Sequence, residues 1–266
     1  MGQSTLQRAR DDEKFHLKQV NFVYKEDYER PKVKVKLPNL KTRLPKLNKD
    51  SAMPRSNQAS HGSLDTYLCG STVSGGLSWP QLLKICIGVA FALDYLHNHM
   101  AEKHRIIHHD VKSANVLLDE NWNAKLLDFG LARIGLANQH NTIVITNIVG
   151  THGYCDPQYE KQGFITKELD VYSFGVVLFD VLCGRLACIF LVTMMNGDYS
   201  SIIGLERDTK LVSLIKIIDH RTKIEINPRT ISKFSAIAYQ CLHKTREERP
   251  TIAELAFQLG KLGKSK

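Results

Sequence analysis

Two aspartates and one asparagine recur at close spacing in the middle of the chain, within the segments HHDVKSAN and LLDFGLAR. Asn115 follows Asp110 by five residues, and Asp128 lies thirteen residues further on. Phosphoryl transfer uses a carboxylate to orient the attacking hydroxyl and accept its proton, and hard oxygen ligands to hold magnesium on the phosphates. Lys112 adds a positive charge beside them. One loop Asp is more often a cap than a catalytic group, but D-x-K-x-x-N followed by D-F-G predicts a phosphoryl-transfer site.

The residues on either side of this pattern predict the elements that must position it. Short apolar runs at residues 105–107, 116–118 and 124–127 read as strands around a loop. Upstream, Ser78 is a suitable cap for a helix with Pro80 near its start. Apolar residues then recur at helical spacing at Leu82, Cys86, Val89, Leu93 and Leu96. The polar residues therefore lie at strand ends, behind a long and mostly buried helix.

Three further helices are expected downstream, over Asp170–Leu182, Thr230–Leu242 and Thr251–Leu262. The most apolar window, residues 171–195, contains Asp180, Arg185 and Gly184, which favours a buried helix over a membrane span. The order of elements contains no βαβ repeat. A mainly helical lobe with small hairpins is predicted.

Composition is typical of a globular protein, with 43% hydrophobic residues. Six cysteines lack the spacing of a metal site, and several lie inside apolar helical patterns. They are expected to be buried, reduced thiols. The start of the sequence shows no secretory signal pattern.

The chain resembles the protein kinase family from Gly62 to about Leu262. The resemblance rests on ALDYLH, IIHHDVKSANVLLDE, LLDFGLAR, GTHGYCDPQY, DVYSFGVVL and REERPT, and within the family it is most similar to plant receptor-like kinases and their Pelle-type relatives. It implies an α+β protein-kinase-like fold, with residues 61–263 forming a mainly α-helical C-lobe that carries short β-hairpins.

The resemblance also implies roles for the polar residues, with ATP and Mg²⁺ as cofactors. Asp110 would be the catalytic base and Lys112 the phosphate contact typical of Ser/Thr kinases. Asn115 and Asp128 would be the magnesium ligands, and Leu117 the floor beneath the adenine.

Further residues match the family's positioning groups. Thr151, preceded by Gly150, matches the threonine that closes over the catalytic loop and accompanies Ser/Thr specificity. Asp170 would anchor the backbone of the catalytic loop. His108 and Phe129 resemble the lower half of the regulatory spine.

Three positions depart from the family pattern. His109 stands where many kinases have arginine, so a phosphorylated activation loop would find a weaker, pH-dependent partner. Gln158 replaces a glutamate, which leads us to expect a neutral hydrogen bond from Gln158 to Arg249 in place of an ion pair. Leu127 is bulkier than the small residue usual beside the D-F-G aspartate, and would crowd the nucleotide pocket.

Residues 1–60 differ in composition from the rest. They hold 14 Lys and Arg against 7 Asp and Glu, a net charge of +7 out of +9 for the whole chain. The run PKVKVKLPNLKTRLPKLNK is interrupted by prolines, with one edge strand expected at Val33–Leu37. No Gly-rich loop, strand lysine or helix glutamate is identifiable before His61, and Lys36 fits the lysine poorly. The kinase N-lobe is therefore expected to be absent or highly degenerate, and residues 1–60 a solvated, disordered basic segment.

Three functions remain open. The first is a receptor-like Ser/Thr kinase that transfers the γ-phosphoryl of ATP to a protein, impaired by loss of the N-lobe. The second is a catalytically silent, truncated kinase or pseudokinase that binds signalling partners. The third is a basic segment, residues 31–49, that binds nucleic acid or anionic lipid. We expect a protein substrate or signalling partner, no specific nucleic acid, no transmembrane segment, and a cytoplasmic location with peripheral contact at the plasma membrane through residues 31–49.

Overall fold

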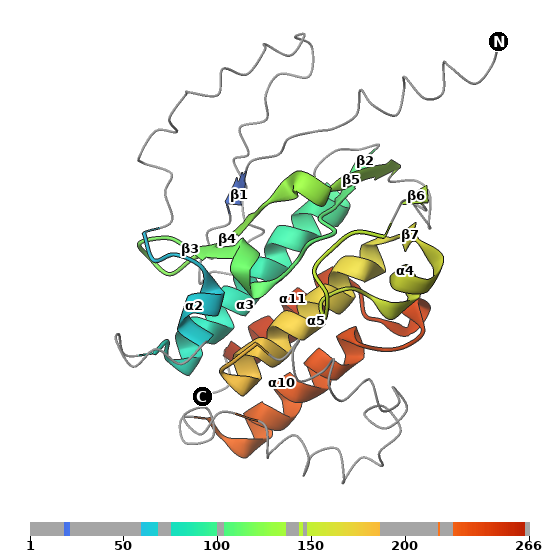
Figure 1. The fold of residues 1–266 in the computed structure, drawn as a ribbon. Helices are drawn as coiled ribbons and strands as arrows, with labels where there is room; N and C mark the ends of the chain where they lie inside the picture. Colours follow the sequence, from blue (N-terminus) through green and yellow to red (C-terminus); the bar gives the residue numbers. More distant parts are fainter. Residues whose placement is uncertain are drawn as a thin grey trace, which may run out of the picture.

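Four helices form the centre of the molecule, a computed structural model that describes residues 19–21, 60–68, 76–99, 104–136, 144–145, 148–186, 218 and 226–263. They are α3 (Trp79–Asp94), α5 (Lys167–Cys183), α10 (Pro228–Cys241) and α11 (Ile252–Gly263). Helix α3 contacts both α5 and α11, and α10 contacts α5 and α11. Figure 1 shows α5 running through the middle of this group. Nearly every residue of α5 is buried, so it is the core helix around which the others pack.

Helix α3 begins where the sequence predicts. The backbone N–H of Ser78 donates to Oε1 of Gln81 at 2.9 Å, and Pro80 lies in the first turn. The helix ends in a π turn, Tyr95–His99. Together, residues 79–99 are long and apolar enough to cross a membrane by length and composition, but here α3 packs against α11 and β4 as a core helix.

Short antiparallel strands lie on the upper side of the helical group in Figure 1, with β4 in contact with α3. One sheet has the order β1 (Gln19–Asn21), β4 (Ala124–Leu127), β3 (Val116–Leu118). A second pairs β2 (His104–Ile107) with β5 (Arg133–Leu136), and a third pairs β6 (Val144–Ile145) with β7 (Phe164–Ile165). Short helices complete the described elements: α2 (Leu64–Leu68), α4 (Pro157–Gln162) and 3₁₀ turns at Ser113–Asn115, Phe129–Leu131 and Arg246–Glu248.

The strand registers bring two loops together. Ile107, at the end of β2, pairs with Arg133 at the start of β5. Val116, at the start of β3, pairs with Leu126 near the end of β4. The loop from β2 to β3 and the loop from β4 to β5 therefore emerge at the same end of these ladders. These are the two loops that carry the polar residues selected from the sequence.

This architecture confirms the predicted fold class, the four helices and the strands at residues 105–107, 116–118 and 124–127. The buried thiols are confirmed for Cys86, Cys183 and Cys241, and burial raises the pKa of Cys86 to about 12. The expected strand Val33–Leu37 and the expected loss of the N-lobe concern residues outside the described part of the chain. Strand β1 was not predicted.

A glycine allows α5 and α10 to approach closely. A Cβ added at Gly175 would lie 2.5 Å from Cβ of Cys241 and 3.0 Å from Cδ2 of Leu242. We expect Gly175→Ala to lower the free energy of unfolding by about 1–3 kcal/mol in urea titrations, because overpacking outweighs the gain in helix propensity. Gly263→Ala is the matched control, because its added Cβ meets side chains only at 3.7 and 3.8 Å. Equal stability of both variants would contradict this account of the helix contact.

Candidate active site

One buried carboxylate holds the backbone of the loop from β2 to β3. Asp170, fully buried on α5, accepts hydrogen bonds from the backbone N–H groups of His108 and His109, each at 2.8 Å. Nε2 of His97 lies 2.8 Å from the same carboxylate. Burial by itself would raise the pKa of Asp170, but the hydrogen bonds that the carboxylate accepts from His97 and from the N–H of His109 lower it. The loop is thus fixed to the core helix through an ionised group.

Asp110 is the centre of a cluster of hydrogen bonds. Its Oδ2 accepts from Nζ of Lys112 at 2.8 Å, and its Oδ1 accepts from Oγ1 of Thr151 at 2.7 Å. Lys112 also donates to Oγ1 of Thr151 at 2.8 Å. Burial opposes ionisation of Asp110, but these bonds lower its pKa below the ordinary value. At neutral pH the carboxylate is therefore ionised and able to accept a proton.

Asn115 has one side-chain oxygen to offer a metal. Its Nδ2 donates to the backbone carbonyl of Asp110 at 2.8 Å and to the carboxylate at 3.1 Å. Both amide hydrogens are then used, because the network assigns Nδ2 to the Asp110 side. The remaining Oδ1 is a hard oxygen ligand of the kind that Mg²⁺ prefers.

Asp128 follows β4 in an unusual backbone conformation. Its φ is +62°, which aspartate tolerates better than most residues. The side chain is exposed, and its Oδ1 accepts from the backbone N–H of Gly130 at 3.3 Å. A carboxylate oxygen is a ligand type that Mg²⁺ prefers.

His108 connects the two loops. Its Nε2 lies 2.9 Å from the carbonyl of Leu127, so this nitrogen donates, and its Nδ1 accepts from the backbone N–H of Asp110 at 3.3 Å. The ring packs on Phe129 with the centroids 4.7 Å apart. Burial lowers the pKa of His108, which suits the neutral form that this tautomer requires. Leu127, which was noted for its bulky side chain, therefore has a structural role through its backbone carbonyl, which accepts this hydrogen bond from His108.

His109 is turned into the protein. Its φ is +70°, its Nδ1 donates to the carbonyl of Leu131 at 3.2 Å, and its ring meets Tyr159 edge-on at 4.8 Å. Within the described residues, its buried Nε2 has no hydrogen-bond partner. The imidazole is therefore held as a packed, neutral side chain, and burial lowers its pKa.

The two buried histidines make stability depend on pH. The unfolded chain binds protons on His108 and His109 near pH 6.5, whereas the folded chain, with both pKa values lowered, does not. The free energy of unfolding should therefore fall as pH drops below about 6.5, by at most about 1.4 kcal/mol per pH unit for each histidine, until the folded pKa is reached. In urea titrations between pH 7.5 and 5.5, His109→Asn should show a shallower decline than the wild type. Asparagine tolerates the positive φ, and an unchanged slope would contradict this origin.

The expected hydrogen bond from Gln158 to Arg249 is replaced by a different arrangement. Gln158 Nε2 donates to the carbonyl of Lys244 at 2.8 Å. Arg249 instead binds both oxygens of Asp156, at 2.8 and 3.1 Å, and Nε of Arg246 binds Asp156 at 2.7 Å. Asp156 also caps α4 by accepting the N–H of Gln158 at 2.8 Å. Its position immediately before Pro157 was the sequence signal, since Asp before Pro is typical of a helix start.

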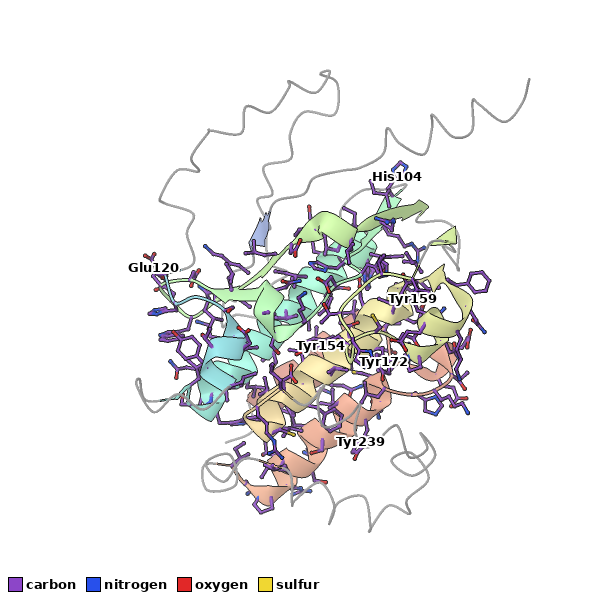
Figure 2. All side chains as sticks on the ribbon, in the orientation of Figure 1. His104, Glu120, Tyr154, Tyr159, Tyr172 and Tyr239 are labelled. Atoms are coloured by element: carbon purple, nitrogen blue, oxygen red, sulfur yellow. The ribbon has the colours of Figure 1, made fainter. Side chains whose placement is uncertain are left out.

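A second buried carboxylate joins the catalytic loop to the segment that carries Thr151. Asp180 on α5 accepts from Oγ of Ser113 and, at 2.6 Å, from Oη of Tyr154. Figure 2 labels Tyr154 near α5, the helix that also carries the labelled Tyr172. Oγ of Ser173 donates to the carbonyl of Tyr154 at 2.8 Å and adds a further link. The sequence offered no signal for this role of Asp180.

Gly150 and Leu117 each lie close to a residue from another part of the chain. Gly150 has a φ of +139°, and an added Cβ would lie 2.6 Å from Sγ of Cys155, so only glycine fits before Thr151. Leu117 is partly buried in β3 and forms a bridge with Ser63. Leu117 therefore lies beside the chain that leads into α2.

Known proteins resemble this chain in sequence. A family model described as the protein kinase domain matches residues 52–258. The receptor-like protein kinase FERONIA of Arabidopsis thaliana is 40% identical over 199 residues, which cover 75% of this chain and 22% of that protein. The receptor-like protein kinases ANXUR2 and HERK 1 of the same plant are 41% and 38% identical, over 69% and 75% of this chain and 21% and 23% of their own lengths.

The chain thus spans less than a quarter of the length of the curated relatives it matches. The match covers α3, α5, α10, the first part of α11, the two loops and the D-F-G segment described above. The chain belongs to the protein kinase family, and the relatives that it resembles are plant receptor-like protein kinases.

Proposed function

We propose that this chain transfers the γ-phosphoryl of ATP to a serine or threonine hydroxyl of a protein. The observation that carries the proposal is the arrangement at Asp110, where an ionised carboxylate lies within 2.8 Å of Nζ of Lys112 and Oγ1 of Thr151. A carboxylate, a cation and a hydroxyl are the groups that orient an acceptor alcohol beside a transferring phosphoryl. We propose residues 61–263 as the unit that carries this site.

Each residue of the cluster has a defined task in this proposal. Asp110 orients the acceptor hydroxyl and takes up its proton as the hydroxyl oxygen bonds to the γ-phosphorus and the bond from that phosphorus to the β–γ bridging oxygen breaks, which releases ADP. Lys112 places a positive charge next to the transferred group. Thr151 binds Asp110 and Lys112 and so keeps these two side chains in position. Asn115 and Asp128 are the residues that would hold Mg²⁺, which supplies charge neutralisation on the phosphates. Leu117 would face the adenine.

The proposed acceptor class rests on Thr151. Its hydroxyl accepts from Lys112 and donates to Asp110, so it lies between the two groups nearest to the reacting atoms. The proposed partner is a protein substrate or signalling protein. We place the chain at the cytoplasmic side of the plasma membrane, and the membrane contact proposed for residues 31–49 lies outside the described structure.

A second candidate, an interaction module without turnover, is favoured by His109. Its ring is buried against Tyr159 and provides no cation at neutral pH, so a phosphorylated activation loop finds no arginine at this position. A lobe of this kind would keep its fold, through Asp170 and α5, and bind partners without transferring phosphate.

Transfer of labelled γ-phosphate separates the two candidates. With Mg²⁺ and a basic protein substrate, the wild type should label serine and threonine but not tyrosine in phosphoamino-acid analysis. Unfolding should be followed in parallel, because ATP with Mg²⁺ at one hundred times its Kd raises the free energy of unfolding by about 2.7 kcal/mol. Labelling no greater than that of Asp110→Asn overturns the kinase proposal and favours the interaction module.

A further inference from the structure

The chain leading into α2 is attached along β3. The backbone N–H of His61 donates to the carbonyl of Leu118 at 3.2 Å, and the N–H of Leu118 donates to the carbonyl of Gly62 at 2.8 Å. Ser63 forms a bridge with Leu117. Residues 61–63, here called the entry segment, therefore lie against the strand residue proposed to face the adenine. In Figure 1 this segment enters α2 beside β3.

An aromatic cluster holds the entry segment from the side. The indole of Trp122 stacks on the imidazole of His61, with the centroids 3.9 Å apart and the planes 5° from parallel. Tyr67 on α2 meets Trp122 edge-on at 5.5 Å and donates from Oη to the carbonyl of His61 at 2.8 Å. Trp122 therefore contacts the entry segment directly at His61 and indirectly through Tyr67 of α2.

The turn between β3 and β4 places Trp122 in this contact. The carboxylate of Asp119 accepts the N–H groups of Asn121 and Asn123, each at 2.9 Å, and the N–H of Trp122 donates to the carbonyl of Asp119 at 2.9 Å. Trp122 adopts a φ of +61°, which is strained for a bulky side chain. Strain of this kind persists where the surroundings over-determine it and often marks a functional position.

We propose that Trp122 is a positioning residue for the nucleotide. It does not touch ATP but fixes the entry segment against Leu117 and Leu118, so that the side of the adenine site is formed before the nucleotide arrives. The inference rests on the proposed function and extends it. Because preorganisation acts on binding, loss of the stack should weaken ATP affinity while leaving the phosphoryl-transfer step unchanged.

The test compares Trp122→Ala with Trp122→Phe and with two controls. Glu120→Ala changes an exposed residue of the same turn, labelled in Figure 2. Phe234→Leu removes an aromatic contact with Trp79 in the core, between α10 and α3, and leaves the stack of His61 on Trp122 intact. For each protein, one measures the Kd of a fluorescent ATP analogue, KM and kcat for ATP, and backbone hydrogen exchange in a peptide covering residues 60–68.

Trp122→Ala should raise Kd and KM by about threefold to tenfold, as expected for loss of one aromatic pair, with kcat within about twofold of the wild type. Exchange in residues 60–68 should accelerate, Trp122→Phe should recover most of the affinity, and the controls should keep wild-type Kd.

Four results overturn the inference. Unchanged exchange in Trp122→Ala means that the stack does not hold the entry segment. Faster exchange with unchanged Kd means that the segment does not shape the nucleotide site. An equal rise of Kd in Phe234→Leu means that general destabilisation is the cause. If the wild type itself binds no nucleotide, the proposed function fails first, and this outcome is distinct from the other three.

Discussion

Asp110→Asn is expected to reduce the rate of phosphoryl transfer by about 10²–10⁴-fold, the usual contribution of a positioned general base. Asparagine has nearly the same shape and still offers an oxygen to Thr151, but it cannot take up the proton of the acceptor hydroxyl. The carboxylate is held ionised by Lys112 and Thr151, so the wild type has the base in its active form at neutral pH. The measurement is kcat at saturating ATP and Mg²⁺.

The control for this prediction is Glu120→Gln, which neutralises an exposed carboxylate in the turn between β3 and β4. It should leave kcat within about twofold of the wild type, because no hydrogen bond described for the site involves the Glu120 side chain. ATP affinity should be retained in Asp110→Asn, since the proposed role of Asp110 is to act on the acceptor hydroxyl and not to bind ATP. A rate close to that of the wild type would remove Asp110 from the proposed mechanism.

Asp156→Asn is expected to lower the free energy of unfolding by about 3–5 kcal/mol, as is typical when one partner of a buried ion pair is removed. The fully buried carboxylate binds the guanidinium groups of Arg246 and Arg249. Asparagine has no charge, so two buried cations would lose their counter-ion. Urea titration at pH 7 measures the loss, provided that the m value shows a two-state transition.

Gln158→Ala is the matched control for Asp156. It removes one hydrogen bond, to the carbonyl of Lys244, and should cost about 0.5–1.5 kcal/mol. Replacement of both arginines by methionine in the Asp156→Asn protein should recover part of the stability, because no unpaired cation is then buried. If Gln158→Ala were the more destabilising variant, the pairing of Arg249 with Asp156 would be refuted.

The four long helices α3, α5, α10 and α11 could be predicted because each shows its own periodicity and, for α3, its own cap, whereas the short helices α2 and α4 were not predicted. The strand contacts that depend on distant partners could not. Strand β1 has three residues and pairs with β4 across about one hundred positions of sequence, so no local pattern specifies it. The neighbours of Arg249 were predicted wrongly for the same reason. Gln158 occupies the position of the family's glutamate, but the guanidinium of Arg249 binds the carboxylate of Asp156, two residues earlier.

In the candidate site too, contacts within one short motif could be predicted, whereas contacts between distant segments could not. The residues of the catalytic loop come from one short motif, so their spacing predicts their proximity, and the structure brings Asp110, Lys112 and Asn115 together. Thr151 joins them from forty-one positions away along the chain, and only the family resemblance indicated this. The burial of Asp180 and the stack of His61 on Trp122 have no sequence signature, because each depends on how two elements pack.

The attachment of the catalytic loop to Asp170 has a consequence for synthesis of the chain. His108 and Asp170 are separated by 62 positions, and His97 and Asp170 by 73. The loop therefore leaves the ribosome well before the side chain that fixes its backbone, and it must stay without this anchor until α5 has been made and has packed on α3. Contacts of such long range form late in folding. We expect order in the nucleotide and acceptor sites to arise after the helical core, so that nascent chains ending before residue 170 have the motif but not its geometry.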